Sequence, residues 1–332
     1  MVKRIAIAGD GQMALVLAES LARSGHDVKL WCPLPGVSAS WIASRRSERL
    51  PELRIPDSVV ITDNPAVALS DATMVVSAIP SQFARSVWER LASHVPSRAG
   101  VVTVTKGVEV GTMRLPREVL RSALGNRPFA VLSGPTIARE LAQHKPAVMV
   151  AASDESFFAT EVQTTFAQPW LRIYTSDDPI GVEIAGAAKN VVALAAGILD
   201  GLDMGFNAKS ALLARGLAES VRVGMAMGAR METFFGVVGV GDLATTCFCP
   251  EGRNRSFGEA IGRGSTTVQA LAASTSVVEG VETARALLAL GKQFSIRMPI
   301  IESVNRVLFE GKSPIEAVHE LMGRDAGAEH VA

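Results

Sequence analysis

A single lysine inside a long apolar segment is the first residue whose surroundings point to chemistry. Residues 181–201 predict one helix, in which the only charged residues are Glu183, Lys189 and the late Asp200. A helix that is apolar on nearly all sides is normally buried, and removing an ammonium from water is costly. Lys189 therefore has a carboxylate partner, or a lowered pKa that makes it a usable base, or a stem along the core with its charge reaching water.

Four short segments elsewhere carry polar residues in positions suited to ligand binding. Lys106 directly follows a predicted strand, and Leu132–Glu140 predicts a turn into a helix whose first N–H groups face outward and can hold an anion. Gly239–Cys247 places Asp242 in a glycine-rich turn. Gly252–Arg255 combines two guanidinium groups with an amide, a composition that suits bidentate phosphate contacts.

Each segment also has a purely structural interpretation. Lys106 fits a solvated loop charge, and Asp242 fits the N-cap of a following helix. Arg253 and Arg255 fit surface cations, and Glu279 fits an ordinary turn. The functional interpretation gains weight because these residues occur together with a buried lysine and a dinucleotide-type fold.

The N-terminal residues predict that dinucleotide-type fold. A β-type run at Lys3–Ala8 is followed by Gly9 and Gly11, then by a helical segment at Met13–Ala22 and a second strand at Asp27–Trp31. In such a unit the first glycine permits the tight turn and the second lets the backbone approach a pyrophosphate, which binds at the helix N-terminus.

Cofactor preference is undecided from these residues. Ala14 stands at the third fingerprint position, a tolerated variant. No acidic residue ends the second strand to hold a ribose hydroxyl, because Trp31–Pro35 stands there, and Arg45 and Arg46 come only further on.

Alternating strands and helices continue to about residue 178 and indicate an open parallel sheet with helices on both faces. The expected strands are Val59–Thr62, Thr73–Ile79, Gly100–Thr105, Phe129–Ser133 and Ala147–Ala152, and the expected helices are Gln82–Ser93, Arg114–Leu124, Thr136–Gln143 and Glu155–Phe166.

Helices alone are expected after that point. They are Gly181–Gly201, Asn207–Gly228, Arg253–Gly262, Thr266–Leu271, Val281–Leu290, Ile300–Phe309 and Ser313–Met322. We therefore predict an α/β fold with an N-terminal Rossmann-type doubly wound sheet (1–180), an all-α C-terminal domain (181–325) and a polar tail (326–332).

Composition argues against several classes of partner. The 332 residues include 33 Lys and Arg and 33 Asp and Glu, whereas nucleic-acid and membrane-surface binders normally have a basic excess. Three cysteines indicate a reducing compartment, and no His, Asp or Glu cluster suggests a metal. The N-terminal apolar run is too short for a signal peptide, and no uninterrupted apolar segment approaches the ~20 residues of a membrane span. We therefore expect a cytoplasmic protein.

Motifs along nearly the whole chain resemble those of the soluble NAD(P)-dependent sn-glycerol-3-phosphate dehydrogenase family. The matching blocks are, in order, GDGQMALVLA, IPSQ, TKG, LSGPTIARELA, GAAKNVVALAAGILDGL, NAKSALLARGLAE, GVGDLATTC, GRNRSFG, VVEGV and MPI. This combination is far more specific than the glycine fingerprint.

The resemblance implies roles for the matching positions. Lys189 matches the catalytic lysine, the general base that takes the proton of the C2 hydroxyl. The implied substrate contacts are Lys106, Gly134, Thr136, Lys189, Asp242, Thr246, Gly252, Arg253 and Asn254, of which Arg253 and Asn254 match the residues that hold the phosphate. The implied cofactor contacts are Gly9, Gly11, Gln12, Met13, Ala14, Pro33, Lys106, Ala138, Arg253, Val277 and Glu279.

Departures from the family pattern lie mainly in the cofactor loop. The family usually has a small residue and an aromatic where this chain has Gln12 and Met13, a glycine at Ala14, and often a basic residue at Pro33. Gly252 stands where bacterial members often have serine. These changes bear on cofactor affinity and on the choice between NAD and NADP.

The function implied is reversible hydride transfer between sn-glycerol 3-phosphate and dihydroxyacetone phosphate, with NAD or NADP as cofactor. It would supply glycerol 3-phosphate for glycerophospholipid synthesis, and the resemblance also implies a homodimer. Two alternatives stay open. One is another two-domain NAD(P)-dependent dehydrogenase of hydroxy acids or sugar phosphates, and the other is an inactive cofactor-binding paralogue.

Overall fold

Two compact units make up the chain in the computed structural model, which describes residues 1–274 and 276–325. The first unit comprises residues 1–105 and 116–179, and the second comprises residues 106–115 and the chain from residue 180 onward. The segment 106–115, which begins with Lys106, therefore packs with the second unit, although it precedes residue 180. The predicted tail, 326–332, lies outside the described residues.

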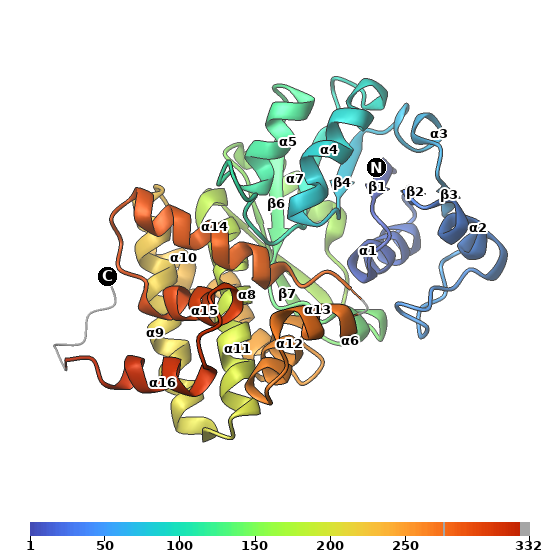
Figure 1. Ribbon diagram of the computed structural model, residues 1–332. Helices are drawn as coiled ribbons and strands as arrows, with labels where there is room; N and C mark the ends of the chain where they lie inside the picture. Colours follow the sequence, from blue (N-terminus) through green and yellow to red (C-terminus); the bar gives the residue numbers. More distant parts are fainter. Residues whose placement is uncertain (275, 326–332) are drawn as a thin grey trace. The chain divides into compact units, whose positions relative to one another are not determined.

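Eight strands of the described residues form one sheet in the first unit, in the order β3-β2-β1-β4-β5-β6-β7-β8 (Figure 1). The strands are β1 (Arg4–Ala8), β2 (Asp27–Trp31), β3 (Val60–Thr62), β4 (Met74–Ser77), β5 (Gly100–Thr103), β6 (Phe129–Ser133), β7 (Ala147–Ala152) and β8 (Leu171–Ser176). The chain order reverses beside β1, between β2 and β4. In such sheets ligands bind at the carboxyl ends of the strands at this reversal.

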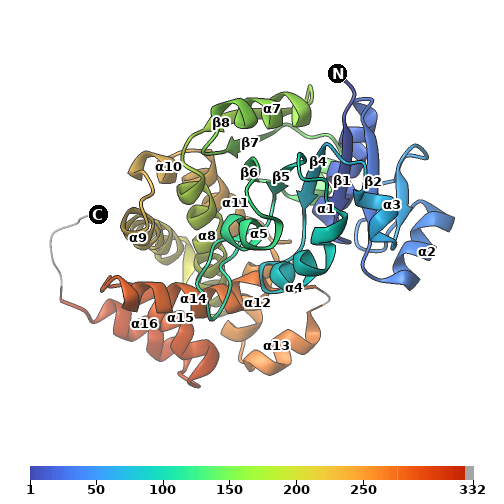
Figure 2. The ribbon, with the colours of Figure 1, turned by 90° about the horizontal axis from the view of Figure 1, so that it is seen from above.

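Helices cover both faces of this sheet, as predicted for a doubly wound fold. Along β1, Ile5 and Ile7 belong to one hydrophobic cluster, whereas Ala6 and Ala8 belong to another, because successive side chains of a strand point to opposite faces. The first cluster includes residues of α1 (Gln12–Arg23), α2 (Pro35–Ser44), α6 (Ala138–Ala142) and α7 (Ser156–Phe166). The second includes residues of α3 (Pro65–Leu69), α4 (Ser81–Leu91) and α5 (Pro116–Leu124), and α4 and α5 lie side by side (Figure 2).

The expectation of a wholly parallel sheet is wrong at one junction. β6 and β7 pair antiparallel, with Val131 opposite Ala152 and Ser133 opposite Val150. A parallel crossover needs a helix that returns the chain along the length of the sheet. The helix between these strands, α6, has five residues and is about 7.5 Å long, so the chain turns back beside β6.

Sequence patterns also missed several short elements. The strand β8 was not expected, and neither were the helices α2 and α3. These segments are short or mix polar and apolar residues, so their periodicity is weak.

The second unit is helical, as predicted. Its helices are α8 (Pro179–Gly201), α9 (Gly205–Ala226), α10 (Met231–Phe235), a π-helical turn η2 (Val237–Gly241), α11 (Asp242–Phe248), α12 (Arg253–Gly262), α13 (Thr267–Ala273), α14 (Glu279–Gln293), α15 (Pro299–Phe309) and α16 (Pro314–Met322). Among the described helices, α8 alone is long and apolar enough to span a membrane by length and composition, and its most apolar window is wholly buried inside the protein.

Glycines allow α8 and α12 to cross at backbone contact. A Cβ added to Gly197 of α8 would lie 1.9 Å from the carbonyl oxygen of Arg255, and one added to Gly258 of α12 would lie 2.0 Å from that of Leu194. No side chain fits at either position without moving a helix. The crossing therefore fixes Lys189 of α8 and Arg253 of α12 on one scaffold.

Candidate active site

Asp242 is the centre of the polar cluster in the second unit. Its side chain is 1% exposed, and each carboxylate oxygen accepts a hydrogen bond from a different lysine. Oδ1 lies 2.5 Å from the Nζ of Lys189, and Oδ2 lies 2.7 Å from the Nζ of Lys106. One buried carboxylate thus serves two ammonium groups.

Local backbone geometry directs Asp242 inward. It is the first residue of α11 and follows the π-helical turn, whose tight path requires glycine because a Cβ on Gly239 would lie 1.8 Å from the carbonyl oxygen of Phe234. The N-cap of α11 is Gly241. The interpretation of Asp242 as an N-cap is therefore wrong.

Lys189 lies in the middle of α8 and is 7% exposed. Its Nζ also donates to the Oγ1 of Thr246, at 2.7 Å, and that hydroxyl donates to the backbone carbonyl of Asp242. Of the three interpretations of this lysine, pairing with a carboxylate and a lowered pKa hold together, whereas a charge reaching water does not.

Burial lowers the pKa of Lys189 to about 8. The negative charge of Asp242 opposes this shift, and the neighbouring Lys106 adds to it. For Asp242 itself, burial favours the protonated form, but Lys106 and Lys189 together hold the pKa of the carboxyl below its usual range. At neutral pH the cluster is one carboxylate beside two amines, of which Lys189 is poised to exchange a proton.

An amide chain connects this cluster to α12 and α14. Asn190, the neighbour of Lys189, donates through Nδ2 to the backbone carbonyl of Lys106 and accepts at Oδ1 from the Nδ2 of Asn254, 2.9 Å away. The Oδ1 of Asn254 accepts from the backbone N–H of Gly280. Sequence reasoning gave Asn190 no role, because its bond to Lys106 joins residues 84 positions apart.

Arg253 and Arg255 differ in their surroundings although both belong to the GRNR motif. Arg253 is exposed and donates through Nη1 to the carbonyl of Val277, next to Glu279 at the start of α14. Arg255 forms ion pairs with Asp200, at 2.6 Å, and with Glu259. Arg253 is therefore the guanidinium of the motif that faces solvent, and Arg255 braces α12 against α8.

Gly252 is the N-cap residue of α12 and lies close to Thr246. A Cβ at Gly252 would be 3.2 Å from the carbonyl oxygen of Thr246. Of the predicted substrate positions in the second unit, hydrogen bonds link Lys106, Lys189, Asp242 and Thr246 directly and Asn254 through Asn190, while Gly252 and Arg253 lie at the start of α12.

In the first unit, the loop after β1 has the form that a pyrophosphate needs. Gly9 has φ +144°, and a Cβ there would lie 2.7 Å from the carbonyl oxygen of Ala78. A Cβ at Gly11 would meet no described atom within 4 Å, and Gly11 is the N-cap of α1, so it offers no side-chain cap. The first N–H groups of α1, at Gln12 and Met13, are therefore available to an anion, while Ala14 is fully buried against the core.

The other predicted contacts of this unit lie after β2 and β6. Pro33 is half-buried just after β2. Gly134 has φ +152° and touches the backbone of Val148, and the hydroxyl of Thr136 donates to the carbonyl of Gly134. Ala138 is the first residue of α6, which at five residues is too short to add a strong dipole.

The chain matches two family models, described as the N-terminus of NAD-dependent glycerol-3-phosphate dehydrogenase over residues 4–159 and its C-terminus over residues 178–319. It is 44% identical over 331 residues to the glycerol-3-phosphate dehydrogenase (NAD(P)+) of Parafrankia sp. (strain EAN1pec), covering 99% of both chains. It is 40% identical over 335 residues to that of Citrifermentans bemidjiense, covering 100% of both. The crystal structure of glycerol-3-phosphate dehydrogenase from Coxiella burnetii matches with a TM-score of 0.94 and 35% identity, over 97% of this chain and 99% of that one.

The chain belongs to the NAD-dependent glycerol-3-phosphate dehydrogenase family. The predicted resemblance and the predicted fold class are thus confirmed.

Arg49 is a feature of this family member's cofactor loop that sequence reasoning missed. Its Nη1 lies 3.1 Å from both the backbone oxygen and the carboxylate Oδ2 of Asp10, and its carbonyl accepts from the side chain of Gln12 at 2.5 Å. Arg45 and Arg46, the two arginines that follow the second strand in the sequence, donate instead to the backbone carbonyls of Val59 and Pro51. Asp10 puts a negative charge in the loop after β1, and the guanidinium group of Arg49 offsets that charge.

Arg49→Ala is expected to raise the Kd of both NADH and NADPH about tenfold (roughly 1.4 kcal/mol), because the carboxylate of Asp10 then repels the phosphates uncompensated. Asp10→Asn in the same chain should restore most of the affinity. Binding is measured by cofactor fluorescence.

Arg46→Ala is the matched control, since this neighbouring guanidinium bonds only to the carbonyl of Pro51 among the described residues. Unchanged affinity in Arg49→Ala, or no recovery in the double variant, would contradict the compensation. A greater loss for NADPH than for NADH would show that Arg49 also contacts the 2′-phosphate.

Proposed function

We propose that this protein is an NAD(P)-dependent glycerol-3-phosphate dehydrogenase, an oxidoreductase that transfers a hydride reversibly between C2 of sn-glycerol 3-phosphate and the nicotinamide, with dihydroxyacetone phosphate as the ketone. Full-length relatives at 40–44% identity with this activity in their names support the assignment. The single structural observation that carries it is the buried Lys189 held by Asp242 and Thr246.

Lys189 has the properties that this oxidation requires of a base. Oxidation of a secondary alcohol needs a group that removes the hydroxyl proton, and in the reverse direction the same group protonates the new alkoxide. With a pKa of about 8, Lys189 is present in both forms near neutral pH. Asp242 and Thr246 fix the direction of its Nζ, and Lys106 places a second positive charge beside the developing oxyanion.

Arg253 is suited to hold the phosphate of the substrate. Its guanidinium is exposed, lies at the start of α12 and is steered by the carbonyl of Val277. Asn254 is 8% exposed, and its amide is largely occupied by Asn190 and Gly280. Phosphate binding energy that is remote from C2 aligns the reacting carbon, which raises the rate of the chemical step.

The residues after β1 fit a dinucleotide, because Gly9 forms the tight turn and the uncapped start of α1 faces open space at Gly11. A bound nicotinamide supplies the hydride acceptor or donor. The N–H groups of Gln12 and Met13 would bind the pyrophosphate of the dinucleotide. The proposal assigns the remaining cofactor contacts to Pro33, Lys106, Ala138, Arg253, Val277 and Glu279.

We place this activity in the cytoplasm, in glycerophospholipid synthesis, and assign the active form to a homodimer. Three free cysteines, at Cys32, Cys247 and Cys249, support a reducing compartment. Family membership supports the lipid role and the dimer.

Both alternatives left open by the sequence are separated from this proposal by one assay. Cofactor oxidation with dihydroxyacetone phosphate is compared with oxidation in the presence of acidic ketones, using NADH and NADPH in parallel. Preference for an acidic ketone would favour the other dehydrogenases, and no turnover with any ketone would favour an inactive paralogue.

Lys189→Ala is expected to lower kcat for glycerol 3-phosphate oxidation roughly 1,000-fold or more, because the carboxylate of Asp242 beside it has a lowered pKa and is a much weaker base. Cofactor affinity should stay near that of the parent chain. Lys145→Ala, which removes an exposed lysine of the first unit, controls for the loss of charge. A variant with near-parental kcat would refute the role of Lys189.

The pH dependence should carry the signature of the same group. For alcohol oxidation Lys189 must be unprotonated, so kcat/KM should rise as pH increases through about 8 and then level off; for ketone reduction it must be protonated, so kcat/KM should fall above about 8. Asp242→Asn removes the charge that raises this pKa, and both inflections should therefore move to lower pH. Inflections that stay in place in Asp242→Asn would mean that another group titrates.

Arg253→Ala should raise KM for glycerol 3-phosphate about 30- to 100-fold, equal to roughly 2–3 kcal/mol of lost charge-assisted hydrogen bonding. Slow reduction of a phosphate-free ketone should barely change. Arg263→Ala, at the exposed end of the same helix, is the control. Equal losses on the phosphorylated and phosphate-free substrates would show that Arg253 does not hold the phosphate.

A further inference from the structure

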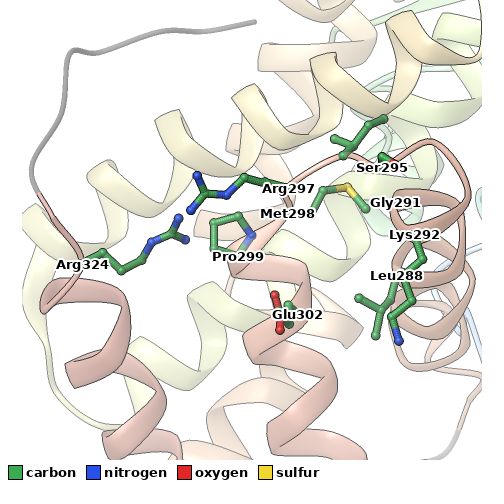
Figure 3. Close-up of a pocket in the computed structure, with 10 residues that line it drawn as sticks. Leu288, Gly291, Lys292, Ser295, Arg297, Met298, Pro299, Glu302 and Arg324 are labelled. Carbon is green, nitrogen blue, oxygen red and sulfur yellow. The ribbon is translucent and has the colours of Figure 1, made fainter.

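The helical unit also contains a pocket that is lined by several basic side chains. A pocket of about 460 Å³ lies between the end of α14, the loop that follows it and the start of α15, and it is lined by Lys292, Arg297 and Arg324 among others (Figure 3). Its volume is that of a site for a small molecule.

Two guanidinium groups in this pocket point toward one another. Figure 3 shows the side chains of Arg297 and Arg324 converging beside Pro299, although they come from different segments. Among the described residues, no carboxylate forms an ion pair with either of them or with Lys292. The single acidic side chain in the lining, Glu302, lies on the other side of Pro299 in this view.

The charged groups that act on Arg222, which contacts the pocket residue Arg297, are also mainly positive. Arg222 of α9 donates to the backbone carbonyl of Arg297. Burial lowers the pKa of Arg222 and Glu219 opposes this shift, while three cations lower the pKa further, namely Arg215, Arg297 and Arg324. Like charges held this close repel, and a bound anion would relieve the repulsion.

Glu219 offsets these cations only in part. Its charge acts on Arg222 and Arg324, but both of its oxygens are hydrogen-bonded at the start of α15. Oε1 accepts from the N–H of Ile300 at 2.7 Å and Oε2 accepts from that of Ile301 at 3.0 Å, so the carboxylate caps the start of α15. Its side chain is 1% exposed. Arg297 and Arg324, which are exposed and form no ion pair with this carboxylate, can therefore bind a ligand.

This pocket is separate from the candidate active site. The helix α14 begins at Glu279, where Gly280 bonds to Asn254, and carries Lys292 in its last turn. Gly280 and Lys292 are twelve positions apart along this helix, which is about 18 Å. An anion in the pocket is therefore not the substrate phosphate held at Arg253.

We propose that this pocket is a second binding site of the protein, for a small phosphate ester. Its phosphate would accept forked hydrogen bonds from Arg297 and Arg324, with Lys292 as a further charge. Leu288 and Met298, which also line the pocket, would contact the organic part of the ester.

Calorimetric titration of the full chain, at constant ionic strength, tests the site with inorganic phosphate and with phenyl phosphate. We expect Arg297→Ala and Arg324→Ala each to weaken phenyl phosphate binding at least tenfold, and the parent chain to bind phenyl phosphate about tenfold more tightly than inorganic phosphate. Arg253→Ala should leave this binding intact. Both variants remove exposed side chains, and circular dichroism confirms their folding.

Arg263→Ala is again the matched control, because it removes an exposed arginine of the same unit outside the pocket. Parental binding in Arg297→Ala and Arg324→Ala would overturn the site. An equal loss in Arg263→Ala would reduce it to a general charge effect, and loss of all binding in Arg253→Ala would place the anion in the active site. Equal affinity for the two probes would overturn the assignment to an ester.

Discussion

The carboxylate of Asp242 is the group on which the polar cluster of the helical unit depends. It is almost inaccessible to water, and it holds Lys106 and Lys189 on its two oxygens. Burying an unpaired ammonium in an apolar helix would cost several kcal/mol, so α8 tolerates Lys189 only because this partner is present. The same pairing prevents burial from lowering the lysine's pKa still further, which keeps it in the range where a base can exchange a proton at neutral pH.

Close helix packing maintains that arrangement. Gly197 and Gly258 let α8 and α12 cross with their backbones in contact, and Asn254 of α12 donates a hydrogen bond to Asn190 of α8. Because the main chains touch, small shifts of one helix are resisted by the other. Lys189 on α8 and the exposed Arg253 on α12 therefore belong to one rigid framework, which suits the proposed binding of a substrate whose phosphate is remote from the reacting carbon.

The degree to which neighbouring charges are paired differs among three parts of the molecule. In the cluster around Asp242, one carboxylate is shared by two cations. In the loop after β1, the carboxylate of Asp10 is offset by Arg49. At the end of α14, the nearby carboxylate of Glu219 accepts two N–H groups at the start of α15 and offsets the described cations of the pocket only in part, without an ion pair to Arg297 or Arg324. This contrast is the physical reason for treating the pocket as a binding site.

Hydrophobic periodicity, glycine spacing and a charge in an apolar helix were enough to predict the α/β class, the change to helices near residue 180, the loop after β1 and a lysine inside a buried helix. Tertiary structure alone decided the direction of β7, the pairing of Lys189 with a residue 53 positions away, and the contacts of Asn190 and Arg49. Periodicity records which face of an element is buried but carries no information on strand direction or on which distant side chain arrives opposite it. Those facts arise only when the whole chain has packed.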